Sequence, residues 1–445
     1  MKKFASSILL LAAGVVCAAA TEPMPLENDS ATAVKGRLLS DFSLTVDEAL
    51  PLFRARYGEQ LTADSLRLYA AKHYIEMKNI DGVDRVHRKS IRNLGLLDPA
   101  RSGWSGRGAA ASPMRLAVVD TILKNEARNR QTATSFKYRF SIDVPYADDL
   151  KGDTLRVWMP LPFVIDGSQP WVNVESAFPA EYVVSGLDRS CHNTIYFQQP
   201  VVEGKTTHFE YVCNYISMAN HKSPSFINAV AGNYKKDSEL YKKYTAFEAP
   251  HIVDMTELAY KIVGDEKNPL KQSQKVFEYI AANYPWGGAR EYSTIECIPQ
   301  YVVDEHHGDC GQVALLYISL MRSLGVPARW ESGWMLHPGE KNLHDWAEVY
   351  FEGVGWVPVD PSFGIYSNAP TAAARDFYAT GLDTYRLRAN KGVCGEFFPP
   401  KRFIRSETVD SQLGEVETSK GNLFYPRWNQ KLEIIKAFDV FKNVK

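Results

Sequence analysis

The spacing of hydrophobic residues predicts helices in the first hundred residues of the chain. Thr45 and Glu48 have the spacing of a capping box, although Pro51 limits the length of the helix that they begin. Thr62 or Asp64 can cap a second helix. The hydrophobic face of this second helix recurs at three- and four-residue intervals, at Leu66, Tyr69, Ala70, Tyr74 and Met77. We therefore expect this part of the chain to be mostly helical.

The hydrophobic period changes to two from residue 135 onward. Alternating positions predict half-buried strands at Phe136, Tyr138, Phe140 and Ile142, and again at Leu155, Val157 and Met159. Residues 194–197 and 208–215 have the same character, and turn sequences around Gly152 and Gly204 separate the runs. Residues 131–220 are therefore predicted to form a β-sandwich-like domain.

Helical spacing returns after residue 254. Two hydrophobic faces are marked by Leu258, Ala259 and Ile262, and then by Leu270, Phe277, Ile280 and Tyr284. Two strand-like runs around a Gly-rich turn predict a hairpin over residues 342–361. Late strands that return to the β domain are predicted at Leu413, Val416, Leu423 and Tyr425.

These patterns predict an α+β protein built from several parts. In chain order they are a signal peptide at residues 1–20, an N-terminal mostly helical region with a linker at 21–130, the β-sandwich-like domain at 131–220, an α+β core at 250–370 and a C-terminal extension with late strands at 371–445.

The composition is that of a globular protein, with 45% hydrophobic and 23% charged residues. It excludes a largely disordered or collagen-like chain. The 51 Lys and Arg residues against 52 Asp and Glu residues leave no positive excess that would favour nucleic acid. Beyond the first twenty residues no run of 18 apolar residues predicts a membrane span.

The first twenty residues have the three-part layout of a secretory signal. Two lysines precede an apolar run, and three consecutive alanines follow it. We expect the mature chain to begin near Thr21 and to be exported, to the periplasm or the extracellular space. A lipid anchor at Cys17 is the alternative, but Val16 stands where a bacterial lipobox usually has Gly, Ala or Ser.

An odd number of cysteines remains once the signal is removed: Cys191, Cys213, Cys297, Cys310 and Cys394. In an oxidising compartment at least one thiol stays unpaired. Cys191 and Cys213 either form a disulfide in the β region or are two small buried side chains. The sequence leaves these alternatives open, together with the pairing of Cys297 and Cys394.

Cys310 lies in the most informative stretch of the sequence. It stands between Gly308 and Gly311 at the start of a strongly apolar predicted helix. The N–H groups and positive end of a helix favour a thiolate, and the glycines leave room for a substrate. Cys310 is therefore a candidate nucleophile, although a cysteine before an apolar helix can also serve packing alone.

The predicted hairpin carries His344 and Asp360. They share a face of the sheet if the turn has an odd number of residues. Direct opposition requires a turn centred on Glu352, whereas a turn centred on Val354 offsets the pair along the strands. If they meet, Asp360 orients the His344 imidazole, whose other nitrogen takes the proton of the Cys310 thiol.

Together these motifs resemble the transglutaminase-like core, a relative of papain-like cysteine proteases. The likeness runs from about residue 255 to 365 and rests on Gly-Asp-Cys-Gly-Gln at 308–312, Arg-Ser-Leu-Gly-Val-Pro-Ala-Arg at 322–329, His-Asp-Trp-Ala-Glu-Val-Tyr at 344–350 and Gly-Trp-Val-Pro-Val-Asp-Pro at 355–361. It implies a Cys310–His344–Asp360 triad that attacks a carboxamide carbonyl to give a thioester. Water resolves the thioester in a peptidase or amidase, and an amine resolves it in a transglutaminase. The β region resembles the β domain that precedes such cores in exported bacterial proteins.

An anion that forms on the attacked carbonyl needs hydrogen-bond donors. The backbone N–H of Cys310 is one candidate, and the side chain of Gln312 or Trp286 is a candidate for the second donor or for substrate binding. No cluster of His, Cys, Asp and Glu has the spacing of a metal site, and the dinucleotide and phosphate-loop fingerprints are absent from the sequence. We therefore expect no metal and no cofactor.

Three functions follow from this interpretation. The first is an exported cysteine hydrolase for a peptide, protein or peptidoglycan-like amide bond. The second uses the same triad to transfer the acyl group to an amine, as a protein-glutamine γ-glutamyltransferase. The third is a catalytically silent binding module on the same fold. Hydrolysis is favoured because water is always present and nothing in the sequence marks an amine or calcium site.

Overall fold

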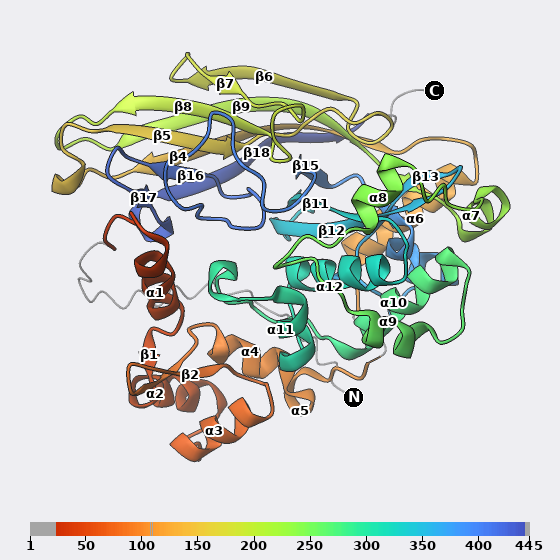
Figure 1. Cartoon of the computed structure of the whole chain (residues 1–445), viewed down its shortest axis with the longest axis horizontal. Helices are drawn as coiled ribbons and strands as arrows, with labels where there is room; N and C mark the ends of the chain where they lie inside the picture. Colours follow the sequence, from red (N-terminus) through yellow and green to blue (C-terminus); the bar gives the residue numbers. More distant parts are fainter. Residues whose placement is uncertain (1–23, 107, 109, 441–445) are drawn as a thin grey trace, which may run out of the picture.

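The computed structural model describes residues 24–106, 108 and 110–440. The expected signal peptide at residues 1–20, its cleavage near Thr21 and the alternative anchor at Cys17 lie outside this part of the chain. None of the helices within it is long and apolar enough to cross a membrane. Figure 1 shows a β-sandwich on one side, a mixed helical and sheet core beside it, and a small helical unit at the N-terminal end.

The N-terminal unit has its own hydrophobic core. The predicted capping box is present, since the side chains of Thr45 and Glu48 accept hydrogen bonds from each other's backbone N–H at the start of α2. Thr62 caps α3, which ends at Ala71. The expected helical face extended to Met77, but Met77 belongs to strand β2. The elements are α1 (Ser30–Asp41), β1 (Leu44–Thr45), α2 (Val46–Tyr57), α3 (Ala63–Ala71), β2 (Met77–Ile80), β3 (Val83–Val86), α4 (Ser90–Leu97) and α5 (Pro99–Ser102).

The β-sandwich is assembled from two distant parts of the chain. Its two sheets have the strand orders β17-β16-β5-β8-β7 and β18-β4-β9-β6. The first part gives β4 (Ala133–Val144), η1 (Asp148–Leu150), β5 (Thr154–Pro160), β6 (Trp171–Phe178), β7 (Val183–Val184), β8 (Thr194–Pro200) and β9 (Thr207–Met218). The second part gives β16 (Glu415–Glu417), β17 (Asn422–Leu423), η4 (Tyr425–Arg427) and β18 (Asn429–Asp439). The C-terminal strands thus complete both sheets, through the pairs β16·β5 and β18·β4 (Figure 1).

The cysteines of the sandwich are not joined to each other. Cys213 on β9 is fully buried, and Cys191 lies in the turn before β8. Both have free thiols, as do the other three cysteines of the described residues. Of the two alternatives left open by the sequence, the structure therefore has no Cys191–Cys213 disulfide.

The central core is built around one buried helix. Residues Gly311 to Arg322 of α12 are all buried, as expected for a helix that is apolar on every side. The core helices are α6 (Pro113–Glu126), α7 (Pro224–Val230), α8 (Glu239–Thr245), α9 (Thr256–Val263), α10 (Pro269–Asn283), η2 (Tyr292–Thr294), α11 (Ile298–Glu305), α12 (Cys310–Ser323), α13 (Ala372–Arg375) and η3 (Phe377–Ala379). Although α6 falls within the N-terminal region expected at 21–130, its Val119 and Ile122 pack into this core.

An antiparallel sheet completes the core, in the order β13-β12-β11-β15. Its strands and a neighbouring two-stranded pair are β10 (Asn220–His221), β11 (Ala328–Met335), β12 (Asn342–Phe351), β13 (Gly355–Val359), β14 (Gly381–Leu382) and β15 (Arg386–Asn390). The predicted hairpin is β12 and β13. The fold is therefore of the predicted α+β class, and α12 and the hairpin bring the candidate residues into one region.

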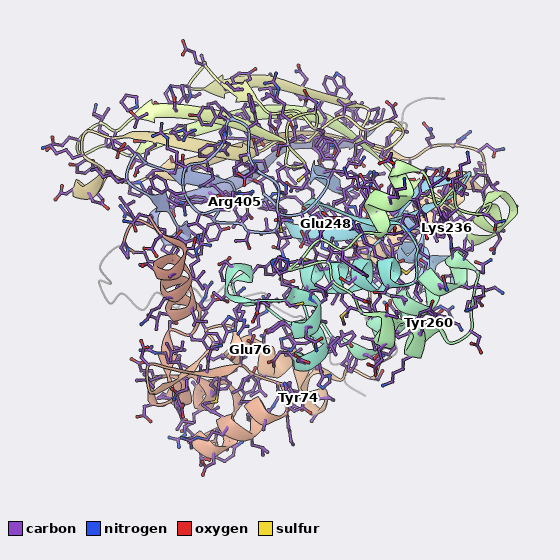
Figure 2. All side chains as sticks on the ribbon, in the orientation of Figure 1. Tyr74, Glu76, Lys236, Glu248, Tyr260 and Arg405 are labelled. Atoms are coloured by element: carbon purple, nitrogen blue, oxygen red, sulfur yellow. The ribbon has the colours of Figure 1, made fainter. Side chains whose placement is uncertain are left out.

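Glu76 joins the N-terminal unit to the core through buried polar contacts. Its Oε1 accepts a hydrogen bond from Tyr301 Oη at 2.6 Å, and its Oε2 lies 3.7 Å from Nη1 of Arg290. The side chain, labelled in Figure 2, is 6% exposed. Burial raises the pKa of Glu76 to about 7, because the attraction of Arg290 offsets only part of the cost of desolvation.

We expect this carboxyl to make the fold less stable as the pH rises from about 4.5 to about 7. In that window the unfolded chain releases the proton while the folded chain keeps it, so rising pH favours unfolding. Glu76→Gln, which keeps an acceptor for Tyr301, should therefore lose less stability than the parent between about pH 5 and 8, by up to about 3 kcal/mol. The measurement is the melting temperature against pH, with the exposed Glu59→Gln as the control. Equal pH slopes in Glu76→Gln and the parent would disprove this assignment.

Candidate active site

Cys310 is the first residue of α12, as the sequence predicts. Asp309 is the N-cap, and its Oδ1 accepts a hydrogen bond from Gln312 N at 3.1 Å. In return, Gln312 Oε1 accepts from Asp309 N at 3.1 Å, which closes a capping box around the cysteine. Tyr292 Oη also donates to Asp309 Oδ1. The backbone on both sides of Cys310 is therefore held firmly.

The thiol of Cys310 contacts a residue that the sequence analysis did not select. Its Sγ donates to Oδ2 of Asp345 at 3.1 Å. Asp345 is 4% exposed, and its Oδ1 accepts from Nε2 of Gln412 at 2.6 Å. The sequence could have indicated Asp345, because it is an acidic residue directly after His344 on a strand predicted to be in the core. Gln412 comes from the C-terminal extension, and no local pattern connects it with the site.

Burial reverses the expected effect of the helix N-terminus on the thiol. The pKa of Cys310 is raised well above its usual value, first by burial and then by the neighbouring carboxyls of Asp345 and Asp309. The pKa of Asp345 is itself raised, by burial and by Asp410 and Asp309. The resting contact is thus between a thiol and a buried carboxyl whose pKa values are both raised, not between a thiolate and a helix dipole.

His344 and Asp360 form a buried pair across the hairpin. His344 Nε2 lies 2.7 Å from Asp360 Oδ2. β12 and β13 pair Phe351 with Gly355, so the turn is centred on Gly353, between the two positions considered from the sequence. The loop has an odd number of residues, and His344 and Asp360 therefore share a face with a small offset along the strands.

Arg386 supports this pair from the neighbouring strand β15. Its Nη1 lies 3.1 Å from Asp360 Oδ2. Although burial opposes ionisation of Asp360, the charges of His344 and Arg386 lower its pKa below the usual value. Burial lowers the pKa of His344, against the attraction of Asp360. A neutral imidazole held by an ionised carboxylate can accept a proton at its free nitrogen.

The structure brings two of the three predicted catalytic residues into direct contact. Within the described part of the chain, His344 has no hydrogen bond to Cys310, because Sγ is engaged by Asp345. His344 and Asp345 are consecutive in β12, so their side chains leave opposite faces of the strand. The Cys310 thiol therefore contacts β12 on the face opposite the side chain of His344.

Cys310 and Asp345 line a cavity of about 400 Å³. Trp286, one of the two oxyanion or substrate-binding candidates, lines the same cavity and is 37% exposed. The other candidate, Gln312, is fully buried in the capping box and is not among the lining residues. Its Nε2 has no partner among the described residues. No group of His, Cys, Asp and Glu in the described ranges is arranged to hold a metal ion.

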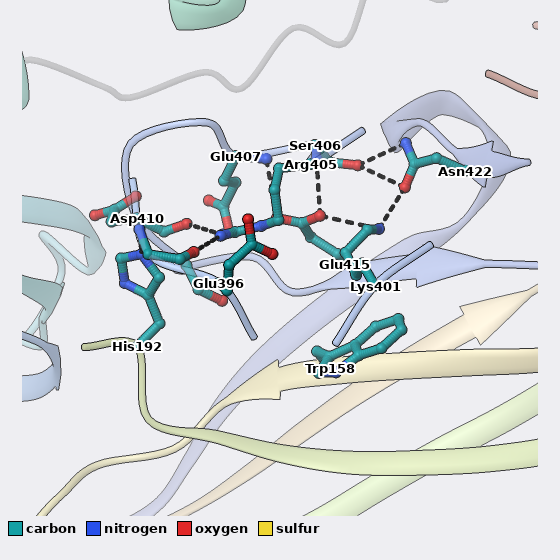
Figure 3. Close-up of polar contacts among 12 residues, drawn as sticks. Trp158, His192, Glu396, Lys401, Arg405, Ser406, Glu407, Asp410, Glu415 and Asn422 are labelled. Carbon is teal, nitrogen blue, oxygen red and sulfur yellow. Dashed lines mark hydrogen bonds and ion pairs between the residues drawn. The ribbon is translucent and has the colours of Figure 1, made fainter. Parts of the chain in front are cut away.

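The C-terminal segment after β15 forms one side of this cavity. Buried ion pairs between its own side chains anchor it (Figure 3). Glu415 Oε1 accepts from Arg405 Nε at 2.6 Å, and Glu415 Oε2 lies 3.0 Å from Lys401 Nζ. Despite burial, these two cations lower the pKa of Glu415 to about 2. Arg405 Nη2 also donates to the backbone oxygen of Asp410 at 2.5 Å. The cluster thereby fixes the loop that carries Asp410 beside Asp345.

Comparison with known families agrees with this geometry. Residues 256–361, which contain α12 and the β12–β13 hairpin, match the family described as the transglutaminase-like superfamily. This part of the chain is a transglutaminase-like domain.

Two relatives each match about a quarter of the chain. Over 145 residues the chain is 28% identical to the uncharacterized protein YebA of Bacillus subtilis, and this match covers 28% of the chain and 19% of YebA. Over 157 residues it is 29% identical to an uncharacterized protein of Haemophilus influenzae, covering 28% of the chain and 40% of that protein. The chain thus matches less than half the length of either relative.

Two solved structures are similar at low sequence identity. A cysteine protease candidate from Cytophaga hutchinsonii is 14% identical with a TM-score of 0.47, and the match covers 71% of the chain and 93% of that structure. The periplasmic domain of TgpA from Pseudomonas aeruginosa is 13% identical with a TM-score of 0.26, covering 60% of the chain and 96% of that domain.

Asp345 in the transglutaminase-like domain gives a direct test of the thiol environment. We expect Asp345→Asn to lower the pH at which Cys310 reacts with iodoacetamide, because it removes an ionisable carboxyl whose negative charge opposes thiolate formation. The measurement is the alkylation rate of the Cys310 peptide against pH, followed by mass spectrometry. Asp304→Asn, at an exposed position on α11, is the matched control and should leave the profile unchanged. A profile in Asp345→Asn that stays in place or moves to higher pH would refute the role given to Asp345.

Proposed function

We propose that the chain is an exported cysteine hydrolase that cleaves a peptide or related amide bond through a thioester on Cys310. The observation that carries the proposal is a thiol at a fixed helix start that opens onto a cavity, on the helix that packs against the strand of the buried His344–Asp360 pair. A nucleophile, a base and an orienting acid in this arrangement are the parts of a thiol hydrolase. Export is supported by the layout of the first twenty residues.

The first half of the reaction requires a shift of α12 relative to β12, because in the resting structure Cys310 Sγ contacts Asp345 on the face of the strand opposite His344. Once Sγ reaches His344, the imidazole takes the thiol proton as Sγ attacks the carbonyl carbon. The carbonyl oxygen becomes an oxyanion, for which the backbone N–H of Cys310 is one donor and Trp286 is a candidate second donor. The C–N bond then breaks, and the imidazolium returns its proton to the leaving amine. The product is a thioester on Cys310.

The second half of the reaction uses water. His344 removes a proton from a water molecule that attacks the thioester carbonyl, and the C–S bond breaks. The proton returns to sulfur, and the carboxylic acid leaves. Through both halves Asp360 holds His344 Nε2 and stabilises the imidazolium, while Arg386 keeps Asp360 ionised.

The test is a screen of the purified protein against N-acetylated peptides, folded proteins and soluble peptidoglycan fragments, with products identified by mass spectrometry. Hydrolysis adds one water to the substrate and releases a free amine. A fluorescent primary amine and a glutamine peptide are included in parallel, because incorporation of the amine would show acyl transfer instead. The absence of any product with all three substrate classes would overturn the proposal and favour the silent binding module.

A further inference from the structure

The N-terminal unit supplies one side of the cavity that contains Cys310. The basic side, as we call it, consists of Arg88, Lys89 and Arg92 at and before α4, together with Arg290. These side chains come from regions outside or at the margin of the catalytic motifs. The carboxyls of Asp345, Glu407 and Asp410 line other parts of the same cavity. The cavity therefore carries both signs of charge, contributed by different parts of the chain.

Three members of the basic side are already engaged. Arg88 Nε lies 3.1 Å from Asp41 Oδ1, Lys89 Nζ donates to the backbone oxygen of Ala289, and Arg290 lies 3.7 Å from Glu76. Arg92 differs from them, because among the described residues its side chain makes no ion pair and no hydrogen bond.

Arg92 is positioned by an aromatic ring. Its guanidinium carbon lies 5.1 Å from the centroid of the Trp286 ring, and both side chains are exposed and line the cavity. A guanidinium over an aromatic face keeps its N–H groups available at the edge, where they can bind a carboxylate through two hydrogen bonds.

A chain of backbone contacts fixes Arg92 relative to the nucleophile. Asn93, the next residue on α4, donates to Gly288 O at 2.9 Å and accepts from Gly288 N at 2.8 Å. The same loop is bridged to the residues before Cys310, since Gly287 N donates to Gly308 O at 3.2 Å and Trp286 pairs with Gly308. The backbones at Arg92, Trp286 and Cys310 thus belong to one hydrogen-bonded frame.

We infer that Arg92 on Trp286 binds a carboxylate of the substrate, so that the site takes acidic peptides with a free carboxylate close to the attacked amide. The inference rests on the proposed function, which supplies the attacked amide bond. The opposite placement is disfavoured, because the side of the cavity formed by Asp345, Glu407 and Asp410 presents acidic groups that offer a carboxylate no ion pair. The acidic group of the substrate therefore lies toward α4, and the N-terminal unit selects the substrate.

The closing experiment compares two thiol reagents of nearly equal size, the anion iodoacetate and the neutral iodoacetamide. The alkylation rate of Cys310 by each reagent is measured by mass spectrometry of the peptide that contains it. The ratio of the iodoacetate rate to the iodoacetamide rate is then compared between the parent and its variants. We expect Arg92→Gln to lower the iodoacetate-to-iodoacetamide ratio about fivefold, and Arg92→Glu to lower it further, because local positive charge concentrates anions. Arg92→Lys should retain part of the preference, and added salt should reduce it in the parent.

Arg67→Gln is the matched control, an exposed arginine of α3 that is not among the cavity residues. It should leave the ratio unchanged. An equal ratio in the parent and Arg92→Gln, with both proteins folded by melting temperature, would overturn the inference. Since alkylation requires only a reactive thiol, this outcome is distinct from failure of the proposed function, which would show as absent turnover. For a peptide that the screen finds to be cleaved, amidation of its carboxylate should slow the parent more than Arg92→Gln.

Discussion

Replacing Cys310 with alanine is expected to abolish amide hydrolysis while leaving the fold intact. The substitution removes the only atom proposed to form the thioester, so the rate should fall by at least about 1,000-fold. The start of α12 should survive, because the capping box of Asp309 and Gln312 uses no atom of the cysteine side chain. The measurement is turnover of a substrate from the screen, with circular dichroism and melting temperature as the test of folding.

Cys297→Ala is the matched control for this substitution. Cys297 is another free cysteine, at the start of α11, and it does not line the cavity. Its replacement should leave turnover unchanged. Hydrolysis by Cys310→Ala at a rate near that of the parent would remove Cys310 from the mechanism.

Replacing Asp360 with asparagine is expected to slow turnover by about 100- to 10,000-fold. The amide has almost the shape of the carboxylate, but it cannot stabilise an imidazolium and can hold His344 in the wrong tautomer. The fold should persist, because Arg386 keeps its second partner, Asp383, at 2.9 Å. The effect should appear in kcat more than in KM, since Asp360 acts through His344 and is not among the cavity residues.

The control for this prediction is Asp376→Asn, which changes an acid paired with Arg375 near the molecular surface. Its turnover should equal that of the parent. If Asp360→Asn retains full kcat while its melting temperature is also unchanged, Asp360 has neither an orienting nor a structural role, and the mechanism would need another partner for His344.

The local parts of the site could be predicted from the sequence. The flanking glycines and the apolar run after Cys310 predicted the start of α12, because helix ends depend mainly on neighbouring residues. The Gly-rich turn predicted the hairpin of β12 and β13, and the alternation of side chains predicted that His344 and Asp360 share a face if the loop has an odd number of residues. The exact offset needed the structure, since the turn is centred on Gly353.

The contacts that tune the site could not be predicted in this way. Asp345 meets Cys310 only because α12 packs against β12, and Arg386 reaches Asp360 from a strand that is later in the chain. The pKa of Cys310 shows the same limit. A helix N-terminus stabilises a thiolate only modestly, whereas burial next to Asp345 has the larger and opposite effect. These effects depend on tertiary packing, which periodicity and spacing do not encode.

The sequence predicted less about the structure and role of the N-terminal unit than about any other part of the chain. Helices α2 and α3 were predicted, whereas the sheet of β1, β3 and β2 was not, and the place of the unit at the site depends on tertiary contacts such as those between Asn93 and Gly288. Neither residue type is distinctive in the sequence. The structure gives this unit a place at the cavity, and Arg92 gives it a testable role in substrate choice.

Trapping the thioester on Cys310 tests the central claim most directly. The parent protein is mixed with a cleaved substrate, quenched in acid during turnover, digested with pepsin and analysed by mass spectrometry. We predict that the peptide containing Cys310 gains the mass of the acyl half of the substrate and loses it on treatment with neutral hydroxylamine. An acyl adduct on a different residue, or steady hydrolysis with no adduct on Cys310 even in the slowed Asp360→Asn variant, would contradict the account.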